Sequence, residues 1–317
     1  MLLSVLDRSR TRLGEPDGQA LHDTIARARR AEDLGYHRFW VAEHHAVPGI
    51  ASGSPAVLLA AIGQVTSRIR LGSGGVMLPQ HQPFVVAEQF RMLEGLHPGR
   101  IDLGLGTSLG FTPAVRRALR REEVSSDEID HDIRELLDYL TSSARITARP
   151  TTDPVPVHVL ASRSGIARAA RLGLPVVVGG PMVFSDRLPA LLAEYRAAFT
   201  GGAPHVMLSV DAFAAPTAER ARELALPEAW AMAQTSRRGE FGPLEPVERI
   251  LAQSWPDRIR ERIEKHLEQV VLGTPTDVAE RLSALATAAG ADEFLISTST
   301  YDRDDLARLD EALIRAL

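Results

Sequence analysis

Short apolar runs alternate with longer amphipathic stretches along the chain, and this alternation restricts the folds that it can adopt. The pattern is typical of a parallel α/β fold, in which buried strands are connected by helices that cover them. Eight runs have the length and composition of strands, at residues 2–6, 37–42, 69–75, 101–105, 155–160, 175–178, 206–213 and 292–298. Eight is the number that a closed (β/α)8 barrel requires, but an open doubly wound sheet also fits the alternation.

The first connection between these runs has the spacing of a helix. Leu21, Ile25 and Ala28 recur at intervals that place them on one face, and Gly35 follows where a helix commonly ends in a left-handed residue. We therefore expect a helix that ends just before Gly35.

The second predicted strand ends in a cluster of reactive side chains. The run WVAEHH, from Trp40 to His45, passes directly from apolar residues to a carboxylate and two imidazoles. Adjacent residues on a strand point to opposite faces, so His44 and His45 cannot both face one ligand in regular geometry. We find no HxH motif and no other compact pair of His and carboxylate at ligand spacing, and we expect no metal site. For His45, a packed structural role and a role in a site are equally compatible with the sequence.

Glycines mark the end of the third predicted strand, in the run GSGGVMLPQHQP from Gly72 to Pro83. Glycine tolerates backbone geometries that are closed to other residues, and it lets a flat ligand approach the main chain. Strand ends that carry reactive side chains and bare backbone are how a parallel barrel forms a pocket. An ordinary glycine bulge at Gly74 and Gly75 is the alternative interpretation.

Taken in order, these motifs resemble the bacterial luciferase-like, flavin-dependent monooxygenases. The resemblance continues with AEQF at residues 87–90 and GRIDLGLG at 99–106, and it resumes with PVHVLASRSGIARAARLGLP at 156–175. It includes VVLGTPTDVAERL at 270–282 and AGADEFLIST at 289–298. One motif alone would be weak evidence, but together they are specific. The resemblance implies a single-domain (β/α)8 barrel over residues 1–317.

The resemblance also implies an activity and partners. We expect a two-component monooxygenase that uses reduced FMN (FMNH2) as a diffusible cosubstrate. Molecular oxygen would add to the flavin, and the resulting C4a-(hydro)peroxide would oxygenate a small organic substrate, for example a secondary metabolite in antibiotic biosynthesis. No second nucleotide-binding unit is visible, so we expect a separate NAD(P)H:flavin reductase. An F420-dependent hydride-transfer oxidoreductase and a non-catalytic flavin-binding partner subunit remain alternatives.

Family resemblance assigns the ring end of the flavin site to the two motifs described first. Positions that match Glu43 and His44 line the flavin site in the family, and we expect these two residues to be catalytic. A histidine near the ring can shuttle a proton or hydrogen-bond an oxygen species. Gly74 and Gly75 are expected against the isoalloxazine ring, where relatives can contain a non-proline cis peptide.

The phosphate end of the expected flavin site departs from the family pattern. Relatives commonly have an arginine that grips the phosphate where this chain has Thr107. The segment Ser162, Arg163, Ser164, Gly165 precedes an Ala-rich helix, expected to begin around residue 165 or 166, whose free N–H groups suit a phosphate. Arg163 would supply the missing charge. The alternative is that Ser164 merely caps the helix. The run GLGTSLG at 104–110 has the wrong spacing for a dinucleotide fingerprint.

Composition excludes several other classes of function. The net charge of −5, without a basic block, makes nucleic acid an improbable partner, because phosphate neutralisation needs clustered cations. The absence of cysteine excludes disulfides, thiolate metal sites and a cysteine nucleophile. The N-terminal run MLLSVLDRSR lacks the features of a signal peptide, and no apolar run is long enough to span a bilayer. We therefore expect a cytoplasmic protein without membrane contact.

Three further segments carry expectations. The helix predicted after Pro55, AVLLAAIGQV, is apolar around most of its circumference. Family members pair through this helix and the one after Pro83, so we expect a homodimer; burial within the monomer is the alternative. Residues 226–264 contain the run RRGEFGPLEPVE at 237–248 and then Trp255-Pro256, whose Gly and Pro predict an irregular insertion, either a lid or a surface loop. The family resemblance implies an active-site segment at residues 107–130, where relatives usually have a longer one, so we expect it to be shortened in this chain.

Overall fold

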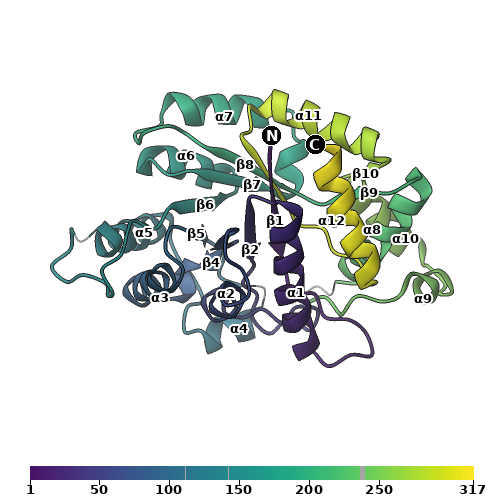
Figure 1. Ribbon diagram of the computed structural model, residues 1–317, viewed down its shortest axis with the longest axis horizontal. Helices are drawn as coiled ribbons and strands as arrows, with labels where there is room; N and C mark the ends of the chain where they lie inside the picture. Colours follow the sequence, from purple (N-terminus) through teal and green to yellow (C-terminus); the bar gives the residue numbers. More distant parts are fainter. Residues whose placement is uncertain (111, 142, 236–239) are drawn as a thin grey trace.

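The computed structural model describes residues 1–110, 112–141, 143–235 and 240–317. Within these residues, eight parallel strands form a closed barrel surrounded by helices (Figure 1). In barrel order the strands are β1 (Leu2–Asp7), β2 (Arg38–Val41), β3 (Arg70–Ser73), β5 (Ile101–Gly106), β6 (Val157–Ala161), β7 (Val176–Gly179), β8 (Val206–Val210) and β11 (Glu293–Ile296). The barrel closes because β1 pairs with both β2 and β11, while β3 pairs with β5. The expected (β/α)8 barrel is confirmed.

Helices follow the strands and enclose the barrel. They are α1 (Gly18–Leu34), α2 (Pro55–Gly63), α3 (Pro83–Leu96), α4 (Pro113–Ala118), α5 (Ser126–Thr141), α6 (Arg163–Leu172), α7 (Leu188–Ala197), α8 (Ala218–Ala233), α9 (Val247–Leu251), α10 (Asp257–Leu267), α11 (Pro275–Ala289) and α12 (Arg303–Ala316). Two short 3-10 turns are η1 (Leu78–Gln80), which follows the short strand β4 (Val76–Met77), and η2 (Gly180–Phe184), which follows β7. As predicted, α1 ends at Gly35, which has φ 88° and whose N–H reaches the carbonyls of Ala31 and Glu32.

All eight predicted strands occur in the barrel, with two differences at their ends. The predicted strand at 206–213 is divided: β8 stays in the barrel, whereas β9 (Ala212–Ala214) leaves it and pairs with β10 (Val271–Gly273). Asp211 lies at the break, where its carboxylate accepts a hydrogen bond of 2.6 Å from Ser297 Oγ. The predicted strand at 69–75 is likewise interrupted after Ser73, and β4 (Val76–Met77) continues it.

A charged network lies in the barrel at the N-terminal ends of the strands. Arg38 donates to Asp102 at 2.7 Å and to Glu293 at 3.0 Å, and all three lie at or near the N-terminal ends of their strands. Trp40 lies above them, donates its indole N–H to Asp102 at 3.3 Å, and is fully buried. This network lies toward the N-terminal ends of the strands, opposite the C-terminal ends at which barrels of this type carry their sites.

The insertion predicted at 226–264 is more regular than expected. Its first residues complete α8, and part of the remainder forms α9 and the start of α10. Pro227 lies inside α8, where packing of the buried Leu224 and Trp230 outweighs its cost to the helix. Residues 236–239, which include the first three residues of the run RRGEFGPLEPVE, lie outside the described residues. The segment after them is anchored to the loop after β1, because Leu244 exchanges backbone hydrogen bonds with Thr11 and Leu13 at 2.9 Å each.

The segment at 107–130 contains α4 and the start of α5. Across the described part of the chain, no helix combines the length and apolar character needed to cross a bilayer.

Candidate active site

A cavity of about 490 Å³ opens at the C-terminal ends of β2, β3, β5 and β6. Six of the residues predicted from the sequence line it: Glu43, His44, Gly74, Gly75, Thr107 and Ser162. They come from four strand ends that are distant in sequence, and the closure of the barrel brings them together. The cavity lies in the size range of small-molecule and cofactor sites.

The Glu43 carboxylate is fully buried and engaged by three donors. Its Oε1 lies 2.7 Å from Nε2 of His45 and 2.7 Å from Nε2 of His81, and its Oε2 accepts the N–H of Met77 at 3.2 Å. Burial alone would raise the pKa of Glu43, but the hydrogen bonds from His45 and His81 lower it overall. Glu43 is therefore an ionised carboxylate that ties the end of β2 to β4 and to the turn before α3.

This arrangement corrects one argument from the sequence. Spacing indicated no other compact pair of His and carboxylate beyond the run at 43–45, yet His81 joins Glu43 and His45 in one cluster. Strand alternation did not apply, because β2 ends at Val41 and the chain then turns. His45 points at Glu43, whereas His44 lines the cavity. The only signal for His81 was its place in the glycine-rich motif, since it lies 38 residues from Glu43.

His44 faces the cavity as a neutral imidazole. Its backbone N–H donates to the carbonyl of Ser52 at 2.9 Å, which fixes the chain just beyond the strand. Burial lowers the pKa of His44 to about 4, and the positive charges of Arg8 and Arg10 act in the same direction. At neutral pH the ring therefore has one nitrogen that accepts a proton and one that donates.

Gly74 and Gly75 form a stretch of bare backbone on the cavity wall. The peptide bond between them is cis, as the family resemblance implied. A Cβ at Gly74 would lie 2.4 Å from Cδ1 of Leu6, and one at Gly75 would lie 2.7 Å from the carbonyl oxygen of Gly104. The contact at Gly75 is with backbone, so that position must remain glycine, whereas a side chain at Gly74 would require the Leu6 side chain to move.

The start of α6 differs from the prediction by two or three residues. The helix begins at Arg163, and its N-cap is Ser162 rather than Ser164. The Ser162 side chain makes no capping hydrogen bond, so the first-turn N–H groups lack the side-chain acceptor that usually satisfies one of them. Arg163 and Ser164 are exposed, while Gly165 is buried against Ala161. Of these residues, only Ser162 lines the cavity.

Arg10 connects the cavity region to the segment after residue 239. Its guanidinium lies 2.8 Å from Glu228 on α8, donates to the carbonyl of Gly49 at 2.6 Å, and stacks 4.8 Å from the ring centroid of Phe241. Arg8 also contacts Glu228, at 3.4 Å. The two cations near His44 are thus held in place by one buried carboxylate.

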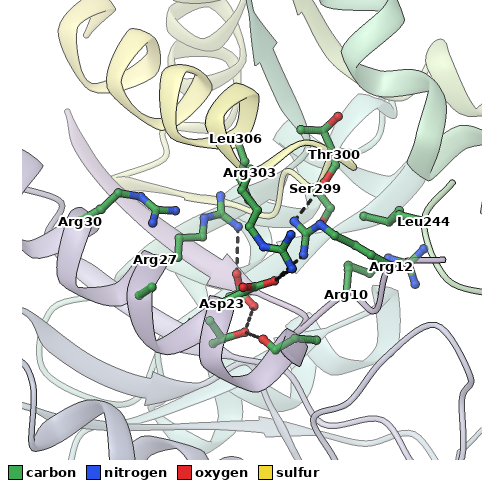
Figure 2. Close-up of a pocket in the computed structure, with 14 residues that line it drawn as sticks. Arg10, Arg12, Asp23, Arg27, Arg30, Leu244, Ser299, Thr300, Arg303 and Leu306 are labelled. Carbon is green, nitrogen blue, oxygen red and sulfur yellow. Dashed lines mark hydrogen bonds and ion pairs between the residues drawn. The ribbon is translucent and has the colours of Figure 1, made fainter. Parts of the chain in front are cut away.

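A second, smaller cavity of about 80 Å³ lies between α1, α12 and the loops after β1 and β11. Arg12, Arg27 and Arg303 converge there on carboxylates, with Asp23 at the centre of Figure 2. Arg27 additionally pairs with Asp310 at 2.7 Å. These guanidinium groups are already neutralised and the space is too small for a flavin ring, so this network is structural.

Comparison with known proteins agrees with the geometry. The profile of the family described as luciferase-like monooxygenase matches residues 1–293. A luciferase-like monooxygenase of Escherichia coli (strain K12) is 34% identical, covering 94% of this chain and 92% of its own length. The N-acetyl-S-alkylcysteine monooxygenase of Bacillus subtilis (strain 168) is 33% identical, with 93% and 92% covered.

The crystal structure of apo-MsnO8 superposes with a TM-score of 0.89 at 33% identity, covering 99% of this chain and 98% of the other. Both the sequence relatives and the fold therefore indicate an enzyme of the monooxygenase class. This chain belongs to the luciferase-like monooxygenase family.

Proposed function

We propose that this chain is the oxygenating component of a two-component system. It would take reduced FMN from a separate NAD(P)H:flavin reductase and use molecular oxygen to oxygenate a small organic substrate. The observation that carries the proposal is the cavity at the C-terminal end of the barrel. One side offers bare backbone at Gly74 and Gly75 beside the neutral ring of His44, and another offers the start of α6. A flat ring with an anionic tail matches this arrangement.

The phosphate is assigned to the side of the cavity formed by Thr107 and Ser162. Their hydroxyl groups and the first-turn N–H groups of α6 are donors, and the helix dipole favours an anion there. Arg163 is exposed at the first position of α6 and makes no ion pair with any other described residue. Its guanidinium is thus available to supply the positive charge that Thr107 lacks.

His44 is the residue that we assign to proton handling. When bound, reduced FMN supplies the electrons that activate dioxygen. The neutral imidazole of His44 can accept or return a proton at the cavity, and it is positioned by the hydrogen bond from its backbone to Ser52. Glu43, whose oxygens already accept three hydrogen bonds, is better suited to holding the end of β2 than to transferring protons.

We also propose that the protein acts as a homodimer through α2 and α3. The inner face of α2 packs in the core through Leu58, Leu59 and Ile62. Its outer face nevertheless leaves Val57 71% exposed, and α3 leaves Met92 56% exposed. These two adjacent helices present an apolar surface that a second copy would cover.

Anaerobic titration with reduced FMN and with reduced F420, followed by admission of oxygen, tests the proposal. We expect saturable binding of reduced FMN, no comparable binding of F420, and an oxygen reaction whose absorbance trace differs from that of free reduced FMN. Preferential binding of F420 without oxygen consumption would instead indicate hydride transfer. Binding of reduced FMN with an oxygen reaction identical to that in free solution would indicate a non-catalytic subunit.

A further inference from the structure

Glu43, His45 and His81 place two imidazole nitrogens and a carboxylate oxygen around one point beside the cavity. The three ligand atoms all lie within 4.8 Å of one another. Both Nε2 atoms approach the same oxygen, Oε1 of Glu43, at 2.7 Å. We propose that these three residues form a binding site for a divalent transition-metal ion of the Zn²⁺ class.

The donor set determines the kind of ion. Two imidazoles and one carboxylate suit Zn²⁺, Co²⁺ and Ni²⁺, whereas Mg²⁺ and Ca²⁺ prefer sites made of oxygen alone. Three protein ligands leave a position for water, as in zinc sites that are not fully closed. The His45 and His81 side chains are 20% and 29% exposed, so solvent can reach that position.

The two imidazoles would adjust their positions to hold the ion. Ligands about 2.0–2.1 Å from a tetrahedral zinc lie about 3.3 Å from one another. The present 2.7 Å separations between Nε2 and Oε1 would open by about 0.6 Å. The two Nε2 atoms lie within 4.8 Å of each other and would close by at most about 1.5 Å, through rotation of two partly exposed imidazoles. The carboxylate would not need to move, because the N–H of Met77 already holds Oε2 and leaves Oε1 directed at the histidines.

The position of the site gives the ion a structural effect. Glu43 and His45 follow β2, while His81 lies between η1 and α3. A bound ion would therefore cross-link two segments that both border the cavity, and it would stabilise the folded state by mass action. This inference rests on the donor geometry alone and does not require that the cavity binds a flavin.

The test uses tag-free protein, treated with chelator and dialysed, and adds Co²⁺ or Zn²⁺ as the chloride. Co²⁺ should give one equivalent of a visible absorption band typical of four or five ligands, and Zn²⁺ should displace it and raise the Tm. His45→Gln and His81→Gln should each weaken binding by at least about a hundredfold, since loss of even an outer partner costs 10–100-fold. His22→Gln, an exposed histidine on α1, is the matched control and should bind as the wild type does.

Two results would overturn the proposal. The first is the absence of a visible Co²⁺ band at stoichiometric metal in the wild-type protein, a measurement that depends on no variant. The second is equal binding in the wild type and both variants, with folding checked by circular dichroism, since this would place the ion elsewhere on the surface. If one variant fails to fold, the other decides.

Discussion

The buried carboxylate of Glu228 allows a quantitative test of how the region beside the cavity is held. Its side chain is 1% exposed and lies 2.8 Å from Arg10 and 3.4 Å from Arg8. Burial would raise the pKa of Glu228, but Arg10 and Arg8 outweigh it and lower the pKa from 4.5 to about 2. A fall of this size corresponds to about 3 kcal/mol of stability at neutral pH. Independently, removal of one partner of a buried ion pair generally lowers the free energy of unfolding by about 3–5 kcal/mol.

Glu228→Gln should therefore lower the free energy of unfolding at pH 7 by about 3 kcal/mol, because the variant leaves Arg10 buried without its carboxylate. The pKa of Glu228 is depressed in the folded state, so its contribution is complete above pH 4.5 and is lost as the pH falls toward 2. The difference in free energy of unfolding between the wild type and Glu228→Gln should therefore become smaller as the pH falls from 4.5 toward 2.

Denaturant unfolding followed by circular dichroism measures this difference. Glu223→Gln is the matched control: Glu223 lies on the same helix and pairs with Arg220 at 2.9 Å, but both side chains are exposed. The control variant should lose at most about 1 kcal/mol of unfolding free energy. A loss for Glu228→Gln that is no larger than that of the control would refute the account of this buried pair.

Three further predictions concern the proposed activity. Arg163→Ala should weaken binding of reduced FMN about ten- to a hundredfold, because a charge-assisted phosphate contact is worth roughly 1.5–3 kcal/mol. The same variant should leave binding of riboflavin unchanged. Equal losses of affinity for both ligands in fluorescence titrations would show that Arg163 does not act on the phosphate. His44→Ala should reduce kcat far more than it reduces the Tm. Because the pKa of His44 is about 4, its ring is neutral above that pH, and the wild-type rate should not fall through protonation of His44 until the pH approaches 4. A His44-dependent fall in rate near pH 6.5 would contradict the neutral state that we assign to this ring. Val57→Asp changes a side chain that is 71% exposed, so it should give monomers in sedimentation without loss of stability. A wild-type protein that sediments as a monomer at micromolar concentration would rule out the dimer.

Local sequence was sufficient for the strands and for most of the cavity wall. Each barrel strand is a buried apolar run, and the residues at its C-terminal end are polar or glycine, so position along a strand predicts position in the barrel. This reasoning located Glu43, His44, Gly74 and Gly75 correctly on the cavity. It also succeeded at Gly35, whose left-handed conformation at the end of α1 follows from local backbone sterics.

Features that depend on contacts distant in sequence were missed. The link between Glu43 and His81 spans 38 residues and exists only because β2 and β3 are neighbours in the barrel. The break at Asp211 reflects its contact with Ser297 beyond β11, which apolar periodicity cannot detect. The choice between Ser162 and Ser164 as the cap of α6 depends on where β6 ends, so two serines of equal capping propensity could not be separated.

A crystal structure of the protein with bound FMN would test the central claim most directly. The account predicts the isoalloxazine ring against the Gly74–Gly75 backbone and within reach of His44, with the phosphate at the start of α6 beside Ser162 and Arg163. A flavin bound outside this cavity, or one whose phosphate lies away from α6, would contradict it.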